Sequence, residues 1–222
     1  MTGFKNRSDA GKRLAAKLQG YANRPNAVVL GLPRGGIPVA FEVATKLGLP
    51  LDVFVVRKLG VPGHEEFAMG AIASGGIRVL NDDTIRSLNI PREMIESVAE
   101  KQGEELKRRE QVYRGSRLHL DVRDLTVILV DDGLATGATM RAAVQALRKQ
   151  KPLSIIVAVP AAAPEACEEL GEEADDIICA ITPDPFFSVG SWYEDFSQTT
   201  DDEVRQLLKI AHEAEKNMGQ KS

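Results

Sequence analysis

Two adjacent carboxylates follow a short apolar segment near the middle of this 222-residue chain. Residues 127–130 read Val-Ile-Leu-Val, Asp131 and Asp132 come next, and a Gly- and Thr-rich segment leads into a helical pattern that ends near Lys149. A run of apolar β-formers predicts a strand buried on both faces. Ligands of open α/β sheets bind at the carboxyl ends of the strands. We therefore expect the two acids to lie at a binding site.

The segment after the acids has the composition of a phosphate-binding loop. A glycine-rich turn that opens a helix offers backbone N–H groups and the positive end of the helix dipole to an anion. The segment has neither the Lys of a Walker A loop nor the glycine pattern of a dinucleotide site. Because Asp131 and Asp132 can accept hydrogen bonds from vicinal hydroxyls, the predicted ligand is a sugar phosphate. The alternative is that the acids merely cap the helix.

This stretch resembles the phosphoribosyl-pyrophosphate signature of type I phosphoribosyltransferases, above all the version in adenine phosphoribosyltransferases, which also has Ala at the position of Ala135. In that family the acid pair holds the ribose 2′ and 3′ hydroxyls. The resemblance implies Mg²⁺ as cofactor, with Asp131 and Asp132 reaching the metal indirectly, through ribose or water. The residues implied to hold the 5-phosphate are Leu134, Ala135, Thr136, Gly137, Ala138 and Thr139.

A second loop follows the strand expected at 27–32. Arg34 offers a forked cation for a phosphate, and Gly35 and Gly36 allow the backbone to approach a ligand closely. A plain strand-to-helix turn is the alternative. The loop resembles the pyrophosphate loop of the family, in which the peptide before the basic residue is often cis. We therefore expect Arg34, Gly35 and Gly36 to bind pyrophosphate, and the Pro33–Arg34 peptide to be cis.

A third segment follows the strand expected at 52–56. Arg57 and Lys58 could neutralise a pyrophosphate, and the glycines and proline that follow predict a mobile segment carrying His64, Glu65 and Glu66. A solvated loop in which the cations pair with the glutamates is the alternative. The opening Arg-Lys-x-Gly resembles the loop that closes over the site in adenine and orotate phosphoribosyltransferases. The residues implied to be catalytic are Arg57, Lys58, Glu66, Asp131 and Asp132, with Glu66 in acid–base work.

Aromatic residues gather between Pro183 and Phe196. They could seal the end of the sheet or stack on a base. The segment resembles the hood of hypoxanthine-guanine phosphoribosyltransferases, although one extra residue precedes Asp195. Those enzymes also have an Asp at the position of Ala135 and a Lys in the strand expected at 153–159, which this chain does not share. The residues implied to contact the base, whose identity stays open, are Phe187, Val189, Trp192 and Asp195.

Alternating strand and helix patterns predict an α/β fold with a parallel sheet covered by helices. The resemblance implies the type I phosphoribosyltransferase fold over residues 1–222, with a core at about 24–182, a hood from 1–23 and 183–222, and a helical insertion at about 82–117. The expected helices are 8–19, 37–47, 91–113, 138–149, 164–170 and 201–216. The expected strands are 27–32, 52–56, 71–73, 77–80, 126–130, 153–159 and 176–181.

The overall composition is that of an ordinary globular protein, with 43% hydrophobic and 27% charged residues. The net charge of −4 argues against broad nucleic-acid binding. Cys167 and Cys179 lack metal-ligand spacing, so we expect reduced core residues. The longest apolar run, 155–164, is too short to span a bilayer, and residues 1–20 lack the apolar region of a signal peptide. We expect a cytoplasmic protein without nucleic-acid or membrane partners.

The family resemblance implies a homodimer that moves ribose 5-phosphate from phosphoribosyl pyrophosphate to a nitrogen acceptor, such as a purine or another nucleobase, and releases pyrophosphate. The rival interpretation is a regulatory protein that senses phosphoribosyl pyrophosphate without turning it over. The position of Ala135, where the hypoxanthine-guanine enzymes have an acid, favours the rival. A working Arg57-Lys58 pair favours chemistry, because a sensor does not expel pyrophosphate.

Overall fold

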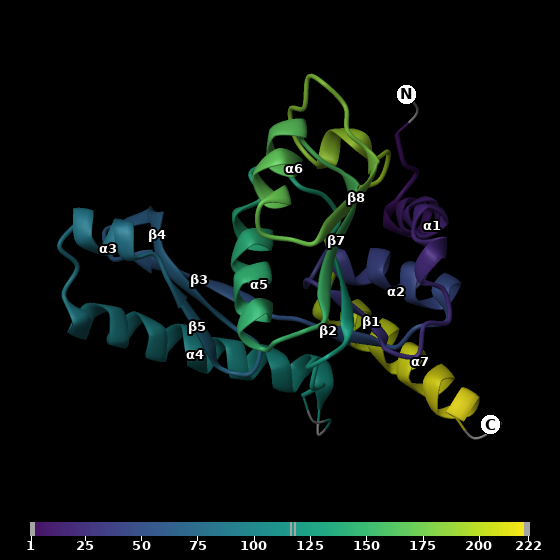
Figure 1. Cartoon of the computed structure of the whole chain (residues 1–222), viewed down its shortest axis with the longest axis horizontal. Coiled ribbons are helices and arrows are strands. Elements are labelled where there is room, and N and C mark those ends of the chain that lie inside the picture. The colour runs from purple at the N-terminus through teal and green to yellow at the C-terminus, as the bar shows by residue number, and fades with distance from the viewer. Residues whose placement is uncertain (1–2, 116, 118, 220–222) are drawn as a thin grey trace.

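A five-stranded parallel sheet forms the centre of the protein in a computed structural model that describes residues 3–115, 117 and 119–219 (Figure 1). The strand order is β2-β1-β6-β7-β8, and every neighbouring pair is parallel, which confirms the expected sheet. Strand β6, which precedes the acid pair, is central and buried along its whole length. The strands are β1 Ala27–Gly31, β2 Leu51–Val53, β6 Thr126–Val130, β7 Ser154–Ala161 and β8 Asp176–Ile181.

Helices cover both faces of this sheet (Figure 1). Alternate strand residues point to opposite faces, so Val29 and Ile128 pack with the helices of one face while Val28 and Leu129 pack with those of the other. The first face carries α1 Arg7–Lys17, α2 Gly36–Leu47 and α7 Asp201–Gly219. The second face carries α5 Ala138–Lys149 and α6 Pro164–Gly171. Helix α1 begins one residue earlier than expected, because Asn6, not Ser8, accepts the capping hydrogen bond from the backbone N–H of Asp9.

Residues 56–114 form an arm that projects from the central sheet (Figure 1). It contains the antiparallel strands β3 Val56–Val61, β4 His64–Ala73 and β5 Ile77–Leu80, followed by α3 Asp82–Ser87 and α4 Arg92–Arg114. The mobile loop expected after Arg57 is therefore a hairpin. The Pro-Gly signal marks only its turn at 62–63, where Gly63 has a φ of 79°. The expected helical insertion is the second half of the arm.

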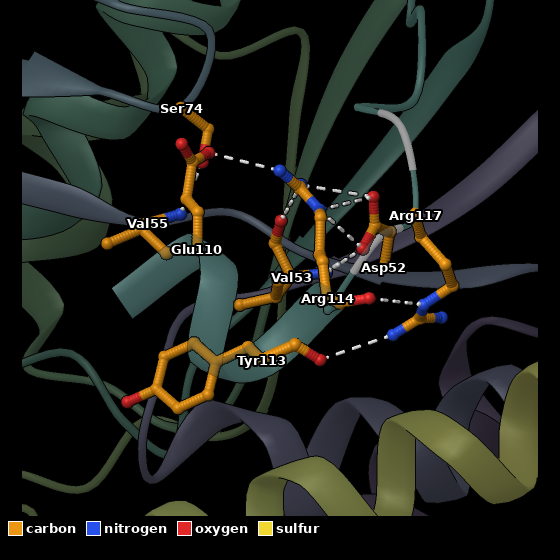
Figure 2. A network of polar contacts seen from close by, with 8 residues as sticks. All are labelled: Asp52, Val53, Val55, Ser74, Glu110, Tyr113, Arg114 and Arg117. Carbon is orange, nitrogen blue, oxygen red and sulfur yellow. Dashed lines mark hydrogen bonds and ion pairs between the residues drawn. The ribbon is translucent and has the colours of Figure 1, made fainter. Parts of the chain in front are cut away.

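The last turn of α4 is anchored to edge strand β2 by a buried ionic network (Figure 2). The Arg114 side chain is only 5% exposed. It donates from Nε to both oxygens of Asp52 at 3.1 Å, from Nη1 to Glu110 Oε1 at 3.0 Å, and from Nη2 to the carbonyl of Val53. A buried guanidinium that has all these partners is compensated for its lost hydration. The network fixes one end of a long helix.

A small hood, formed by residues 3–5 and 183–196, covers one end of the sheet. The backbone N–H of Phe4 donates to the carbonyl of Trp192 at 2.7 Å, and the N–H of Glu194 donates to the carbonyl of Phe4 at 2.8 Å. The Phe4 and Tyr193 rings pack with their centroids 5.4 Å apart. Helix α7, expected in the hood, instead lies against α2, α4 and β2, because its apolar side enters the core through Val204 and Leu208.

Candidate functional site

The acid pair lies at the carboxyl end of β6, as the sequence predicts. Both residues are half-buried, and the backbone N–H of Asp132 donates to Asp131 Oδ1 at 2.8 Å. Burial raises the pKa of Asp131 well above its usual value, and the charge of Asp132 raises it further. Burial also raises the pKa of Asp132, although Arg7 counteracts part of that rise. Two neighbouring acids short of compensating charge are suited to accept hydrogen bonds from a ligand.

Arg7, on the first turn of α1, contacts this pair and was not anticipated from the sequence. Its Nη2 and Nε lie 2.8 and 2.9 Å from Asp132 Oδ2, and its Nη1 donates to the carbonyl of Ser197 at 2.6 Å. The guanidinium carbon also lies 4.0 Å from the centre of the Phe196 ring. Arg7 therefore fixes the orientation of the Asp132 carboxylate. A basic residue near the start of a helix is too common a pattern to have revealed this.

Tyr193 is a second unanticipated neighbour of the acids. Its hydroxyl donates to the backbone carbonyl of Asp132. Burial raises the pKa of this phenol, and the negative charge of Asp132 adds to the rise, so the group stays a neutral hydrogen-bond donor. The aromatic gathering in the 183–196 segment was the available signal, but it did not separate Tyr193 from its neighbours. Arg7 and Tyr193 together fasten the hood to the acid pair.

The loop after the acids leads into α5 with an open helix end. Gly137 is the N-cap, with a φ of 69° in the left-handed region that favours glycine, and no side-chain cap bond is made there among the described residues. The Thr136 and Thr139 side chains beside it are exposed. Leu134 is buried, and its N–H donates to the carbonyl of Ala161 at 2.8 Å, which holds the loop to β7. The first N–H groups of α5 are therefore not capped by a side chain of the described residues, as a phosphate site requires.

The loop at 32–36 lies directly against the acid pair. The N–H of Leu32 donates to the carbonyl of Val130 at 2.9 Å, and the Pro33–Arg34 peptide is cis, which confirms the expectation. A Cβ atom at Gly35 would clash with the Asp132 carboxylate, and one at Gly36 would lie 2.8 Å from the Val130 carbonyl. These two glycines therefore permit a contact between the loops that no other residue allows.

Arg57 and Lys58 do not lie at the end of a parallel strand as expected. Strand β2 ends at Val53, and the N–H of Phe54 donates to the carbonyl of Gly31 at 3.0 Å. Arg57 and Lys58 then follow within β3, where successive side chains point to opposite faces. Arg57 Nε donates to Gln102 Oε1 of α4 at 2.9 Å, whereas Lys58 is exposed. The Glu66 side chain lies outside the described part of the structure, so its expected role is a prediction without a geometry.

The four residues expected to contact a base lie in different surroundings. Phe187 is 83% exposed. Val189 packs on Gly133, where an added Cβ would clash with its side chain. Trp192 instead stacks within the hood on Phe186, with ring centroids 6.4 Å apart. Asp195 is exposed and accepts a hydrogen bond from the N–H of Ser197 at 2.9 Å. Of the four, Val189 is thus the one that contacts the segment directly after the acids, while Phe187 presents an exposed ring.

A cavity of about 610 Å³ adjoins the open end of α5. Thr136 and Ala138 of the loop line one side, and Gly70, Ala71 and Val79 of the arm line the other. The concave space therefore begins at the expected phosphate site and runs between the arm and the body of the protein.

No group of three or more metal-binding side chains occurs among the described residues. Cys167 and Cys179 are free and half-buried, with their sulfur atoms 3.2 Å apart. None of the helices in the described ranges has the length and apolarity that a membrane crossing needs.

The sequence of this chain is similar to those of known proteins, in one case over most of its length. The family model of the phosphoribosyl transferase domain matches residues 4–74 and 63–194. A Mycobacterium tuberculosis protein, itself named a phosphoribosyl transferase only provisionally, is 46% identical over 209 residues. That match covers 94% of this chain and 47% of the relative, so the chain spans about half the length of that curated protein. The bifunctional protein PyrR of Haemophilus influenzae is 61% identical over 36 residues, which are 16% of this chain and 20% of PyrR.

The fold is also shared with a solved structure. The crystal structure of TT1426 from Thermus thermophilus superposes with a TM-score of 0.83 at 42% sequence identity, covering 94% of this chain and 98% of that one. Because the superposition covers 94% of this chain, it extends beyond the central sheet to the arm and the hood. From the family match and the strand order of its helix-covered sheet, we conclude that this chain belongs to the phosphoribosyl transferase domain family and has the type I phosphoribosyltransferase fold.

Proposed function

We propose that this protein transfers ribose 5-phosphate from phosphoribosyl pyrophosphate to a nitrogen atom of a nucleobase-like acceptor and releases pyrophosphate. The observation that carries the proposal is the contact between Gly35 and the Asp132 carboxylate, which leaves no room for a Cβ atom. It brings a loop suited to pyrophosphate against acids suited to ribose hydroxyls. The open end of α5 follows these acids within five residues. One molecule of phosphoribosyl pyrophosphate would therefore contact all three, with its diphosphate, its ribose and its 5-phosphate.

Each part of the donor has a matching group. The 5-phosphate would accept hydrogen bonds from the N–H groups at the start of α5 and from the Thr136 and Thr139 hydroxyls. The ribose 2′ and 3′ hydroxyls would donate to Asp131 and Asp132. The pyrophosphate would lie on the 32–36 loop beside the guanidinium of Arg34. The raised pKa of Asp131 fits this assignment, because hydroxyl donors would stabilise its charged form.

Mg²⁺ fits this site as an ion that arrives on the diphosphate. Two carboxylates are too few for an all-protein cage, and Arg7 already engages one oxygen of Asp132. Asp131 and Asp132 would hold the ion through ribose or water. When bound, the metal would supply positive charge to the leaving pyrophosphate.

The acceptor would lie under the hood. Phe187 offers an exposed ring for stacking, and Val189 packs on Gly133, next to the acids. In the reaction the bond between ribose C1 and the pyrophosphate oxygen breaks, and a bond from C1 to the acceptor nitrogen forms. The proton of that nitrogen is lost to a base, a role for which Glu66 is the candidate. The protein mainly orients the reactants and neutralises the leaving group.

The test combines binding with turnover. Titration calorimetry would measure phosphoribosyl pyrophosphate with Mg²⁺ on the wild type, on Asp131→Asn/Asp132→Asn, and on the exposed control Asp202→Asn. Pyrophosphate release would then be followed with adenine, hypoxanthine, guanine, xanthine, uracil and orotate. We expect binding by the wild type and the control, loss of binding in the double variant, and release with one base. Binding without release for any base would favour the sensing protein, and absence of binding would refute the donor site.

A further inference from the structure

Two adjacent arginines of α4 share a single carboxylate but differ in their surroundings. Arg108 Nε lies 2.7 Å from Glu105 Oε2, and Arg109 Nε lies 2.8 Å from Glu105 Oε1. Hydrogen bonds from Arg108 and Arg109 lower the pKa of Glu105 to about 2, so its carboxylate stays charged. The Arg108 side chain is 59% exposed and that of Arg109 is 33% exposed. One carboxylate therefore accepts hydrogen bonds from two guanidinium groups, and Arg109 is the less exposed of the two arginines.

Arg57 meets the same side of α4. Gln102, which accepts from Arg57 Nε at 2.9 Å, precedes Glu105 by three residues and Arg109 by seven. Residues at these spacings lie on one side of a helix. Burial lowers the pKa of Arg57, the positive charge of Arg109 lowers it further, and that of Arg108 has a smaller effect in the same direction. The Glu105 carboxylate opposes this effect but already accepts hydrogen bonds from two arginines, so this side of α4 carries more positive than negative charge.

Arg34 belongs to the same end of the sheet. Gly31 pairs with Val53 across β1 and β2, so the chains that lead to Arg34 and to Arg57 leave the sheet side by side. Tyr113 lies one helical turn after Arg109 on α4. Burial raises its pKa to about 12, the hydrogen bond from its hydroxyl to Asp201 adds to the rise, and the nearby charges of Arg109 and Arg34 act against it.

We propose that Arg109 is a pyrophosphate-binding residue, and that α4 completes with Arg34 and Arg57 a three-arginine site for the leaving group. This inference rests on the function proposed above and adds to it a role for the arm. A diphosphate carries several negative charges, and the planar fork of arginine matches phosphate oxygens in pairs. Arg34 on the 32–36 loop supplies one such fork, and Arg109 on α4 would supply a further positive charge.

The network of Figure 2 explains how a helix from a projecting arm can hold a residue at the site. Arg114 ties the last turn of α4 to Asp52 and Val53 of β2, five residues beyond Arg109. The other end of α4 lies far out in the arm (Figure 1). The position of Arg109 is therefore set by the end that is fixed to the sheet.

The competing explanation is that Arg109 forms only a surface ion pair with Glu105, which contributes little to stability. Arg108 is a matched control, because it is adjacent, has the same charge and binds the same carboxylate, but is more exposed. Titration calorimetry would measure inorganic pyrophosphate with Mg²⁺, and separately ribose 5-phosphate, on the wild type, Arg109→Ala, Arg109→Gln and Arg108→Ala. The glutamine variant keeps a long polar side chain and removes the charge, so it separates loss of the charge from loss of side-chain packing.

We expect both Arg109 variants to bind pyrophosphate about 10-fold or more weakly, which corresponds to one lost charge-assisted contact, with ribose 5-phosphate binding unchanged. The Arg108 variant should stay within about 2-fold of the wild type, as suits an exposed charge. Equal effects of the Arg108 and Arg109 variants, or a parallel loss of ribose 5-phosphate binding, would overturn the role of Arg109 alone. If the wild type bound neither pyrophosphate nor ribose 5-phosphate, the proposed function would fall with it.

Discussion

The guanidinium of Arg7 binds the carboxylate of Asp132, with Nη2 and Nε at 2.8 and 2.9 Å from one oxygen, although the two residues are 125 positions apart in the sequence. The same guanidinium reaches the carbonyl of Ser197 and lies over the Phe196 ring. Helix α1, the acid pair and the segment after the hood therefore meet at a single side chain. The arrangement fixes the orientation of the Asp132 carboxylate, which we propose to bind a ribose hydroxyl, before any ligand arrives.

Arg7→Ala should lower both stability and donor affinity. The change leaves a half-buried carboxylate without its cation, which we expect to cost about 1–3 kcal/mol in the free energy of unfolding. Urea denaturation would measure it, and calorimetry should show weaker binding of phosphoribosyl pyrophosphate. Arg24→Ala is the control, because Arg24 also lies over an aromatic ring, that of Tyr21, at 4.7 Å. If both variants behaved alike, the contact with Asp132 would have no special role.

Gly35→Ala should impair the site more than the fold. The new Cβ would collide with the Asp132 carboxylate, so either the 32–36 loop or the acid must move. We expect loss of phosphoribosyl pyrophosphate binding, measured by calorimetry, with a native circular dichroism spectrum. Gly20→Ala provides the comparison, because nothing lies within 4 Å of a Cβ built there. Undiminished binding by Gly35→Ala would mean that the ligand does not depend on this close approach.

Asp131→Asn should stabilise the protein at neutral pH while removing donor binding. The pKa of Asp131 is higher in the folded state than in the unfolded chain, because burial disfavours its charge. Between the pKa of the unfolded chain and the raised pKa of the folded state, the folded state holds more protons. The free energy of unfolding therefore falls as pH rises above the ordinary pKa of an aspartate. The asparagine variant loses this dependence, and its gain over the wild type should grow with pH in urea titrations at pH 4 to 8.

Asp175→Asn should change the free energy of unfolding in the opposite direction in the same urea titrations. A hydrogen bond from Arg148 lowers the pKa of Asp175, so this group contributes stability above the unfolded pKa that is lost as pH falls. Its substitution should destabilise the protein at neutral pH and matter less in acid. The assignment of a raised Asp131 pKa would be contradicted by two results together. The wild-type free energy of unfolding would rise with pH, as the lowered pKa of Asp175 alone predicts, and Asp131→Asn would be no more stable than the wild type.

Phe187→Ala should affect the acceptor and leave the fold intact. A side chain that is 83% exposed contributes little to the core, so the free energy of unfolding should change by less than about 0.5 kcal/mol. Loss of ring stacking on a base should raise the KM of the acceptor up to about 10-fold, since such contacts are worth about 0.5–1.5 kcal/mol. Phe67→Ala, an exposed phenylalanine of the arm, is the comparison. Equal KM values for wild type and Phe187→Ala would exclude stacking at this ring.

The features that could be predicted from the sequence are those that depend on consecutive residues. Val127 to Val130, the acid pair and the segment that ends at Thr139 give a buried strand, an acidic edge and an open helix end in the order that the structure shows. The parallel sheet followed from the alternation of such local patterns, and the cis peptide before Arg34 from the resemblance of its loop. Short-range patterns suffice here because strand periodicity, turn chemistry and helix starts depend on near neighbours.

The distant residues that contact these features became apparent from the three-dimensional packing of the chain. The contact of Arg7 with Asp132, the hydroxyl of Tyr193 on the same residue, and the pairing of Arg57 with Gln102 each link parts of the chain that no local pattern connects. The hairpin after Arg57 escaped prediction because its strands are stabilised by cross-strand pairing and by packing on α4, while its glycines and proline indicate a loop. Such choices depend on long-range packing, which a single sequence does not specify residue by residue.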